Sequence, residues 1–370
     1  MTKHQQIRET LEASIRQGEY PASSRLPSER ELAARFGVSY LTARRAVADL
    51  VDARLLERRA RSGTYVREGG ARRLAATTVN LICTTEDRTL NRSFLRIGAR
   101  LLTERGWEAH PLRIHAEDDR AAARAVAEPG SLSVVVLEGV ERIEERTPLL
   151  LEALRKAQGR AVLLANRMDQ YGIPSVVADD PHALRMAVSH LREHGHRQIA
   201  LLTDQPEHPV ARVQIAAWRS ACAADGEGTA LSSEALLRRL IVVRPDSYDC
   251  LPTATYHAVR SFVGSGEGSS VTALISLLDE MCLPVLAALR DEGRVVPESF
   301  SLVSLGDSSL LSFTHPAVTC VDVDLESHLR LALEVLESAR RGEWQEQDSL
   351  RLVEPRLVVR QSVGAAPSRP

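Results

Sequence analysis

Apolar residues follow two different spacings along the chain. Near the start, Ile7, Leu11 and Ile15 lie four residues apart, which is typical of one face of an amphipathic helix. Beyond residue 77, short continuous apolar runs alternate with helical patterns, and this alternation predicts parallel sheets covered by helices. The expected strands lie over 79–83, 133–140, 161–166, 198–204, 240–243, 272–278 and 300–306, and the expected helices over 94–104, 149–157, 211–224, 256–263 and 284–291.

The segment LPSERELAARFGVS predicts the first half of a helix-turn-helix. Ser28 is followed three residues later by Glu31, which is the spacing of a capping box at a helix start. Gly37 is suited to end that helix, and Ser39 is suited to cap the next one, expected from Tyr40 to about Val51. Two short helices joined by such a turn form a helix-turn-helix.

The second of these helices is the candidate for reading DNA. Its first turns carry Tyr40, Thr42, Arg44 and Arg45, where a recognition helix presents side chains to base edges. Two short strands are expected over 55–57 and 64–66, and they predict a wing whose tip carries Arg61 for the minor groove. Within the wing, Gly63 would allow close approach to the DNA backbone. The alternative is a three-helix module that contacts only other proteins.

Charge is distributed unevenly between the two parts. Residues 1–76 contain 15 basic and 9 acidic residues, a net charge of +6, while residues 77–370 carry a net charge of −8. A small basic domain on a larger acidic body favours nucleic-acid binding by the small domain. The five cysteines form no C-x-x-C pair, and no run approaches about 18 apolar residues, so we expect no disulfide framework, no metal, no cofactor and no membrane span. The N-terminal segment has no apolar signal core, which favours the cytoplasm.

The run LPSERELAARFGVSYLTARRAVADLVDARLLERRARSGTYV resembles the GntR-type winged helix of bacterial transcription regulators over residues 1 to about 68. This resemblance implies that Arg30 contacts DNA from the first helix of the motif and Arg44 from the second, with further contacts from the wing. Tyr40 stands where many members have arginine. The expected DNA-binding residues are Arg30, Ser39, Tyr40, Thr42, Arg44, Arg45, Arg61 and Gly63.

The rest of the chain resembles the effector domain of lactose-repressor-type regulators, which is itself similar to periplasmic sugar-binding proteins. This resemblance is carried, in order, by the segments SVVADDPHALRMAVSHLREHGHRQIALLTD, VPESFSLVSLGDSS and PRLVVRQSV. The pairing of a GntR-type N-terminal head with this larger C-terminal body resembles the arabinose-repressor branch of GntR-type regulators. It implies two lobes of α/β structure, with lobe one over about 78–178 and 323–345 and lobe two over about 179–321 and 347–363. In such folds ligands bind at the carboxyl ends of the strands.

The expected effector pocket departs from that of sugar-binding relatives. Gln214 stands where those relatives have an arginine that binds sugar hydroxyls, and Leu278 replaces a ligand asparagine, leaving Asp279 beside it. Ungapped alignment places Gly306 at another ligand position, whereas a one-residue gap restores Asp307 to it. The candidate effector-binding residues are Phe94, Gln214, Asp279 and Asp307. Either the effector is less polar than a sugar or otherwise different, or the cleft no longer binds one.

Three weaker signals favour ordinary structure over chemistry. His190, His194 and His196 have a spacing that can hold a metal, but they are interpreted as structural. The glycine-rich stretch 264–270 lacks the Lys-Ser/Thr of a P-loop and is interpreted as a surface connection. Asp179 and Asp180 are interpreted as hinge or surface residues. No G-x-S-x-G motif supports an enzyme, which makes a two-lobed enzyme with an accessory basic domain the less favoured reading.

The sequence thus predicts a winged helix-turn-helix domain over 1–68, a linker over 69–77, a two-lobed domain of parallel sheets over 78–363 and a disordered tail over 364–370. We expect a homodimeric transcriptional repressor of the cytoplasm that binds a pseudo-palindromic operator in double-stranded DNA. A sugar-like small molecule in the cleft would modulate that binding. The alternative is the same DNA-binding head on a body that only dimerises, or that answers to a non-sugar effector or a protein partner.

Overall fold

The computed structural model describes residues 3–16, 19–21, 23–52, 55–59, 62–67, 77–85, 89–115, 118–137, 140, 143–223 and 233–367. Its contacts form two compact units, one of residues 1–79 with 102–109 and the other of residues 80–101 with 110–370. Arg61 and the predicted linker, apart from Thr77, lie outside the described residues.

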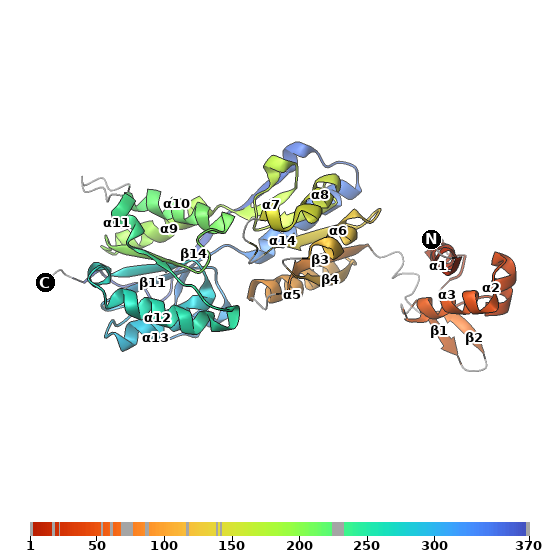
Figure 1. Cartoon of the computed structure of the whole chain (residues 1–370), viewed down its shortest axis with the longest axis horizontal. Coiled ribbons are helices and arrows are strands. Elements are labelled where there is room, and N and C mark those ends of the chain that lie inside the picture. The colour runs from red at the N-terminus through yellow and green to blue at the C-terminus, as the bar shows by residue number, and fades with distance from the viewer. Residues whose placement is uncertain are drawn as a thin grey trace. The chain divides into compact units, whose positions relative to one another are not determined.

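The N-terminal head consists of three helices and a two-stranded antiparallel ribbon (Figure 1). The elements are α1 (Lys3–Arg16), α2 (Glu29–Phe36), α3 (Tyr40–Asp52), β1 (Leu56–Arg59) and β2 (Gly63–Val66). The apolar residues at helical spacing are buried together, as the pattern predicts. They include Ile7, Leu11, Ile15, Leu32, Ala43, Val47 and Leu50.

Local signals position the two helices of the helix-turn-helix. The Glu31 amide donates to Ser28 Oγ at 3.3 Å, and the Ser28 amide donates to the Glu31 carboxylate at 2.7 Å, which completes the predicted capping box. Gly37 ends α2 in the left-handed region with φ +61°, a conformation that glycine adopts without a side-chain clash. Capping and turn chemistry therefore position α3.

Replacing Ser28 by alanine should destabilise the head. Ser28→Ala leaves the Glu31 amide without its capping acceptor, and such a loss costs about 1 kcal/mol of the free energy of unfolding. Urea denaturation followed by circular dichroism measures this change. Glu31→Gln, which keeps the side-chain bond to the Ser28 amide, should cost less; an equal or larger loss in Glu31→Gln would contradict this account of the cap.

The body contains two six-stranded sheets (Figure 1). The first has the order β13-β7-β6-β5-β3-β4 and the second the order β14-β12-β11-β10-β8-β9. Strands of the first sheet are β3 (Thr78–Thr84), β4 (Glu108–Ile114), β5 (Leu132–Val136), β6 (Ala161–Leu164), β7 (Ser175–Ala178) and β13 (Leu350–Val353). Strands of the second are β8 (Ile199–Thr203), β9 (Leu240–Val242), β10 (Ala273–Ser276), β11 (Ser301–Leu305), β12 (Thr319–Asp322) and β14 (Arg356–Val358).

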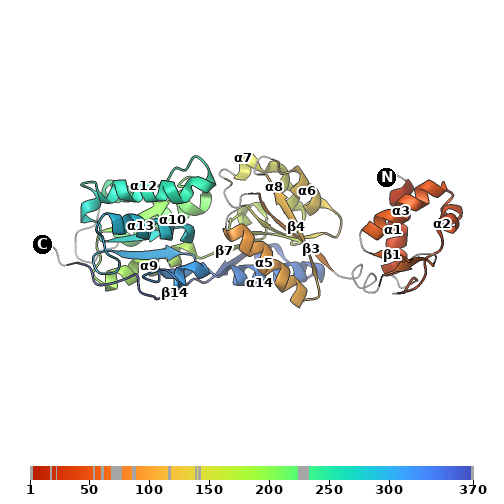
Figure 2. The same cartoon turned by 90° about the horizontal axis from the view of Figure 1, so that it is seen from below.

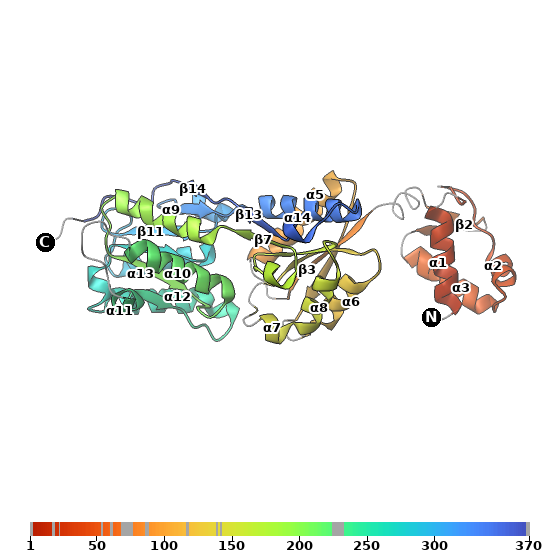
Figure 3. The same cartoon turned by 90° about the horizontal axis from the view of Figure 1, so that it is seen from above.

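Helices cover both faces of each sheet. On the first sheet, α5 and α14 lie on one face and α6, α7 and α8 on the other (Figures 2 and 3). On the second, α9, α10 and α11 pack on one face and α12 and α13 on the other (Figure 1). Their bounds are α5 (Thr89–Glu104), α6 (Arg120–Ala127), α7 (Ile143–Arg146), α8 (Pro148–Lys156), α9 (Asp180–Glu193), α10 (Pro209–Ala223), α11 (Ser233–Leu237), α12 (Leu251–Val263), α13 (Cys282–Asp291) and α14 (Leu325–Arg340).

The predicted fold class, a winged helix-turn-helix plus two α/β lobes, is confirmed, and the second sheet contains one antiparallel pair of strands. β14 pairs with β12 in antiparallel fashion, whereas the pairs within β8, β9, β10, β11 and β12 are parallel. The pattern missed β4, an edge strand that contains Pro111 and alternates little between buried and exposed residues. Proline, which has no amide proton to donate, is tolerated there because one side of an edge strand has no neighbouring strand to hydrogen-bond.

The predicted lobe boundary near residue 346 is wrong. β13 pairs in parallel with β7, from Leu350 opposite Ser175 to Val353 opposite Ala178, so residues 350–353 belong to lobe one. The chain therefore passes between the sheets after β7, after β12 and after β13. The last passage lies at Glu354 and Pro355.

The C-terminal segment is also ordered further than the sequence predicts. The Gly364 amide donates to Ser301 Oγ at 3.1 Å, and the Ala366 amide donates to the His194 carbonyl oxygen at 2.7 Å. The backbone passes so close to Pro297 that a Cβ at Gly364 would lie 2.7 Å from its carbonyl oxygen. Residues 364–366 are therefore part of lobe two, and 368–370 lie outside the described residues.

Candidate DNA-binding surface and ligand cleft

The outward face of α3 carries two arginines, Arg44 and Arg45, for which the described residues offer no partner. Arg44 and Arg45 are exposed, while Ala43, Ala46 and Val47 on the same helix turn toward the core of the head. Among the described residues, neither arginine forms a hydrogen bond or ion pair. Arg58, by contrast, is held by Glu29 at 2.7 Å. Two unpaired guanidinium groups on one helix turn are suited to phosphate or guanine contacts.

By contrast, three other residues that are predicted to contact DNA form hydrogen bonds within the head. Ser39 Oγ accepts a hydrogen bond from the Thr42 amide at 3.2 Å and lies 2.8 Å from Thr42 Oγ1, so this pair caps α3. The Tyr40 hydroxyl donates to the Glu29 carboxylate at 2.9 Å. Each of them fixes the position of α3, and their contacts with DNA stay predictions.

The wing shows why residue 63 is glycine. Gly63 has φ +121°, and a Cβ there would lie 2.9 Å from Arg25 Nε. Because L side chains rarely adopt this φ, the backbone conformation itself favours glycine here, and no DNA contact is needed to explain it. Arg30 is exposed and lines a shallow hollow with Arg25, Tyr40 and Gly63.

The body has a cavity of about 210 Å³ at the carboxyl ends of the strands. Val136, Leu164 and Ala178 from the first sheet and Leu277 and Leu305 from the second form much of its wall. This is where open α/β sheets bind ligands. The volume is below the roughly 300–1,000 Å³ of pockets for drug-sized molecules, so the cavity suits a small ligand.

Few polar side chains line this apolar cavity. Two of them, Gln214 and Asp279, are predicted effector residues, and Gln214 Nε2 donates to Asp180 Oδ1 at 2.7 Å. Asp180, which is expected at the hinge or surface, is instead 9% exposed and lines the cavity. In the sequence, the position of Asp180 just after the apolar run of β7 was the feature that could have indicated its place in the cavity. Glu280 and His328 also line the cavity and were not predicted.

Burial changes the protonation of these groups. Removal from water raises the pKa of Asp180 to about 6, although the Gln214 amide works against this shift. Burial likewise raises the pKa of Asp279, opposed by hydrogen bonds from Ser308. Burial lowers the pKa of His328, so its imidazole is neutral at pH 7. The cavity is therefore a site where charged groups are poorly solvated.

Asp180 should make stability depend on pH in the acidic range. Its pKa is raised from 3.8 on folding, so the folded state binds the proton more tightly than the unfolded state. Its contribution to the free energy of unfolding therefore falls as pH rises from about 4 to about 6, by on the order of 3 kcal/mol, and is constant above that. Urea denaturation of wild type and Asp180→Asn at several pH values measures the difference; curves that stay parallel from pH 4 to 7 would contradict the buried acid.

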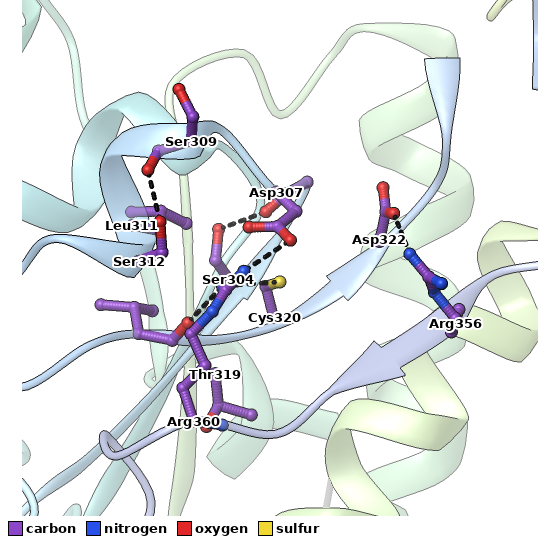
Figure 4. A network of polar contacts seen from close by, with 12 residues as sticks. Ser304, Asp307, Ser309, Leu311, Ser312, Thr319, Cys320, Asp322, Arg356 and Arg360 are labelled. Carbon is purple, nitrogen blue, oxygen red and sulfur yellow. Dashed lines mark hydrogen bonds and ion pairs between the residues drawn. The ribbon is translucent and has the colours of Figure 1, made fainter. Parts of the chain in front are cut away.

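Two predicted effector residues do not reach the cavity. Phe94 is completely buried in lobe one and is not among the lining residues, whereas Leu90, one helical turn earlier on α5, is. Asp307 points instead to Arg360, whose guanidinium lies 2.7 Å from its carboxylate (Figure 4). Gly306, next to Asp307 in the chain, does line the cavity. Both predictions are corrected accordingly.

The three clustered histidines have structural contacts. His194 Nδ1 lies 2.8 Å from the His190 carbonyl oxygen, and His196 bridges Thr272 Oγ1 at 2.9 Å and the Gly364 carbonyl at 3.1 Å. Within the described ranges, no three His, Cys, Asp or Glu side chains are placed to share a metal ion. None of the described helices is both long and apolar enough to cross a membrane.

Comparisons with known families match both parts of the chain. Residues 3–66 match the model of bacterial regulatory proteins of the gntR family, and residues 188–363 match the periplasmic binding protein-like domain. The NagR transcriptional repressor of Bacillus subtilis is 46% identical over 61 residues, 16% of this chain and 25% of its own length. The arabinose metabolism transcriptional repressor of Halalkalibacterium halodurans is 22% identical over 99% of this chain and 98% of its own length.

Other relatives cover a smaller share of the chain. The AscG regulator of Escherichia coli is 24% identical over 56% of this chain. This chain spans 57% of the length of AscG and about three fifths of the length of several other curated relatives. The crystal structure of AscG superposes with a TM-score of 0.62 at 20% identity, covering 78% of this chain and all of that one. A LacI family regulator from Arthrobacter in complex with lactose gives a TM-score of 0.60 at 21% identity, covering 78% and 99%. The chain therefore joins a helix-turn-helix domain of the gntR type to a two-lobed periplasmic-binding-protein-like domain.

Proposed function

We propose that the protein is a cytoplasmic transcriptional repressor whose head binds a specific DNA site and whose body controls that binding through a small molecule in the cleft. The observation that carries the proposal is the unpaired Arg44 and Arg45 on the outward face of α3, in a head that matches the gntR model. Several relatives are transcriptional regulators, and two of them are named as repressors of arabinose metabolism.

The body supports the second half of the proposal. Its cavity lies at the carboxyl ends of two sheets, and the chain passes between those sheets at three places. A ligand that prefers one arrangement of the lobes would shift the population toward that arrangement, and this is the requirement for allosteric control. The Arthrobacter relative was crystallised with lactose, so a sugar is one candidate ligand class for the cleft.

The head would act as one of a pair. A homodimer places two recognition helices on half-sites about one or more helical turns apart. Its two-fold symmetry would therefore match a pseudo-palindromic operator. Sedimentation of the full chain should give a dimer, and a monomer at micromolar concentration would contradict this part of the proposal.

Selection from random-sequence duplexes tests the DNA-binding function. The full chain, incubated with a pool of random duplexes at near-physiological salt, should enrich two related half-sites in inverted orientation. Arg44→Ala serves as the matched variant and should enrich a weaker or degenerate motif. A wild-type pool that remains random after several rounds would contradict sequence-specific binding and favour the alternative of a head that contacts proteins.

A further inference from the structure

The charged groups of the cleft have one sign. Asp180, Asp279 and Glu280 line the cavity, and its described lining contains no lysine or arginine. The remaining titratable group, His328, is neutral at pH 7 because burial lowers its pKa. Arg167 borders only an adjoining hollow and is paired with Asp169 at 2.9 Å. The described lining of the cavity therefore supplies no cation to it.

Asp180 has little compensation for its burial. Its side chain is 9% exposed, and Gln214 Nε2 donates to one of its oxygens at 2.7 Å. In the part of the chain that the structure describes, neither Asp180 nor Asp279 forms an ion pair. A buried carboxylate without a counter-ion is unfavourable, and a positively charged ligand would relieve this cost.

A second observation, independent of the acids, also indicates a ligand that donates hydrogen bonds. Asn166 follows the carboxyl end of β6, is 2% exposed and lines a pocket that shares Leu90, Val136 and Gln214 with the cavity. Its Oδ1 accepts no hydrogen bond from any described residue. Buried acceptors are nearly always paired in folded proteins, so this oxygen lacks a donor that a ligand would bring.

The wall of the 210 Å³ cavity beside these acids is largely apolar. Leu90, Val136, Leu278 and Leu305 contribute hydrocarbon surface, and the amide donor of Gln214 is already used by Asp180. A sugar needs donors and acceptors around its whole ring, and this cavity offers few of them; further polar side chains lie in the adjoining pocket of Asn166. An apolar ligand body would instead gain from contact with the leucine side chains.

We propose that the cleft binds a small organic cation, namely a protonated amine on a compact apolar body. The inference rests on the proposed function, in which the cleft is the effector site. The ammonium group donates to Asp180, Asp279 and Asn166 Oδ1, and the apolar body packs against the leucines. Charge and shape together select against neutral polyhydroxylated ligands.

Isothermal titration of the full chain tests this inference with matched probes. Cyclohexylamine should bind at least tenfold more tightly than its neutral counterpart cyclohexanol, and more tightly than D-ribose. Asp279→Asn and Asp180→Asn, which keep the side-chain shape but remove a charge, should each weaken amine binding at least tenfold. Asp249→Asn removes an exposed charge from the same lobe and should leave amine binding unchanged.

Each contrary outcome has its own meaning. Ribose binding without amine binding would overturn the cationic ligand and keep the cleft as an effector site. Amine binding of equal strength in wild type and in both Asp-to-Asn variants would overturn the inference as well. Absence of any probe binding, with sequence-selective DNA binding intact, would overturn the inference while leaving the DNA-binding function standing. Failure of that function itself is detected separately, by the duplex selection.

Discussion

Arg44→Ala should lower the affinity for the selected operator by about 5- to 150-fold. Arg44 is exposed, carries no partner among the described residues and lies in the second turn of α3. A bidentate contact from such an arginine to guanine contributes about 1–3 kcal/mol of discrimination between bases. Fluorescence anisotropy with the operator and with a scrambled duplex of equal length measures both affinities.

The comparison of the two duplexes separates base reading from phosphate contact. Loss of a base contact weakens operator binding far more than binding to the scrambled duplex. Arg8→Ala also removes one positive charge from the head, but this arginine lies on α1 and is paired with Glu12 at 3.0 Å. It should change both affinities only slightly. Equal losses on both duplexes in Arg44→Ala would show that Arg44 contacts a phosphate.

Asp307→Asn should destabilise the body by about 2–4 kcal/mol without weakening ligand binding. Asp307 and Arg360 are each 17% exposed, and their ion pair joins the end of β11 to the C-terminal segment (Figure 4). Removing one charge of a buried pair leaves the other uncompensated, which is strongly unfavourable. Thermal unfolding should show Tm lower by several degrees, at about 2–4 °C per kcal/mol for domains of this size.

A neighbouring ion pair provides the control. Asp322 pairs with Arg356 at 3.2 Å, but that guanidinium is 76% exposed (Figure 4). Surface pairs contribute about 0–1 kcal/mol, so Asp322→Asn should change Tm by little. Unchanged stability together with lost ligand binding in Asp307→Asn would show instead that Asp307 is a ligand-binding residue.

Local signals were enough to predict the head. The capping box of Ser28 and Glu31, the turn at Gly37 and the apolar face of α3 all depend on residues within a few positions of each other. Such interactions are encoded by spacing alone, and the predicted helices therefore agree closely with the structure. The DNA contact expected of Gly63 stays a prediction, and the positive φ of +121° that favours glycine there is not visible in the spacing of the sequence.

The cleft was predicted less well because its composition depends on distant pairings. Asp307 accepts a hydrogen bond from Arg360, 53 residues later, and so does not line the cavity. Phe94 and Leu90 lie on the same helix, and only the packing of α5 decides which of them is buried in the core. Asp180 lines the cavity because it lies at the junction of β7 and α9, where the chain enters the second lobe. The periodic pattern identified β3, β5, β6, β8, β9, β10 and β11 but not the other strands of the body, and it did not show which residues at the strand ends meet.

The most direct test of the account is the coupling between the cleft and the head. Anisotropy titrations of the selected operator are carried out without ligand and at saturating concentration of the compound that raises Tm most in a screen of sugars, sugar phosphates and amines. Allosteric coupling typically changes affinity by about 5- to 150-fold, and we expect a change of at least fivefold. The change should disappear in Asp279→Asn. Identical operator affinity with and without the bound compound would contradict the claim that the body regulates DNA binding.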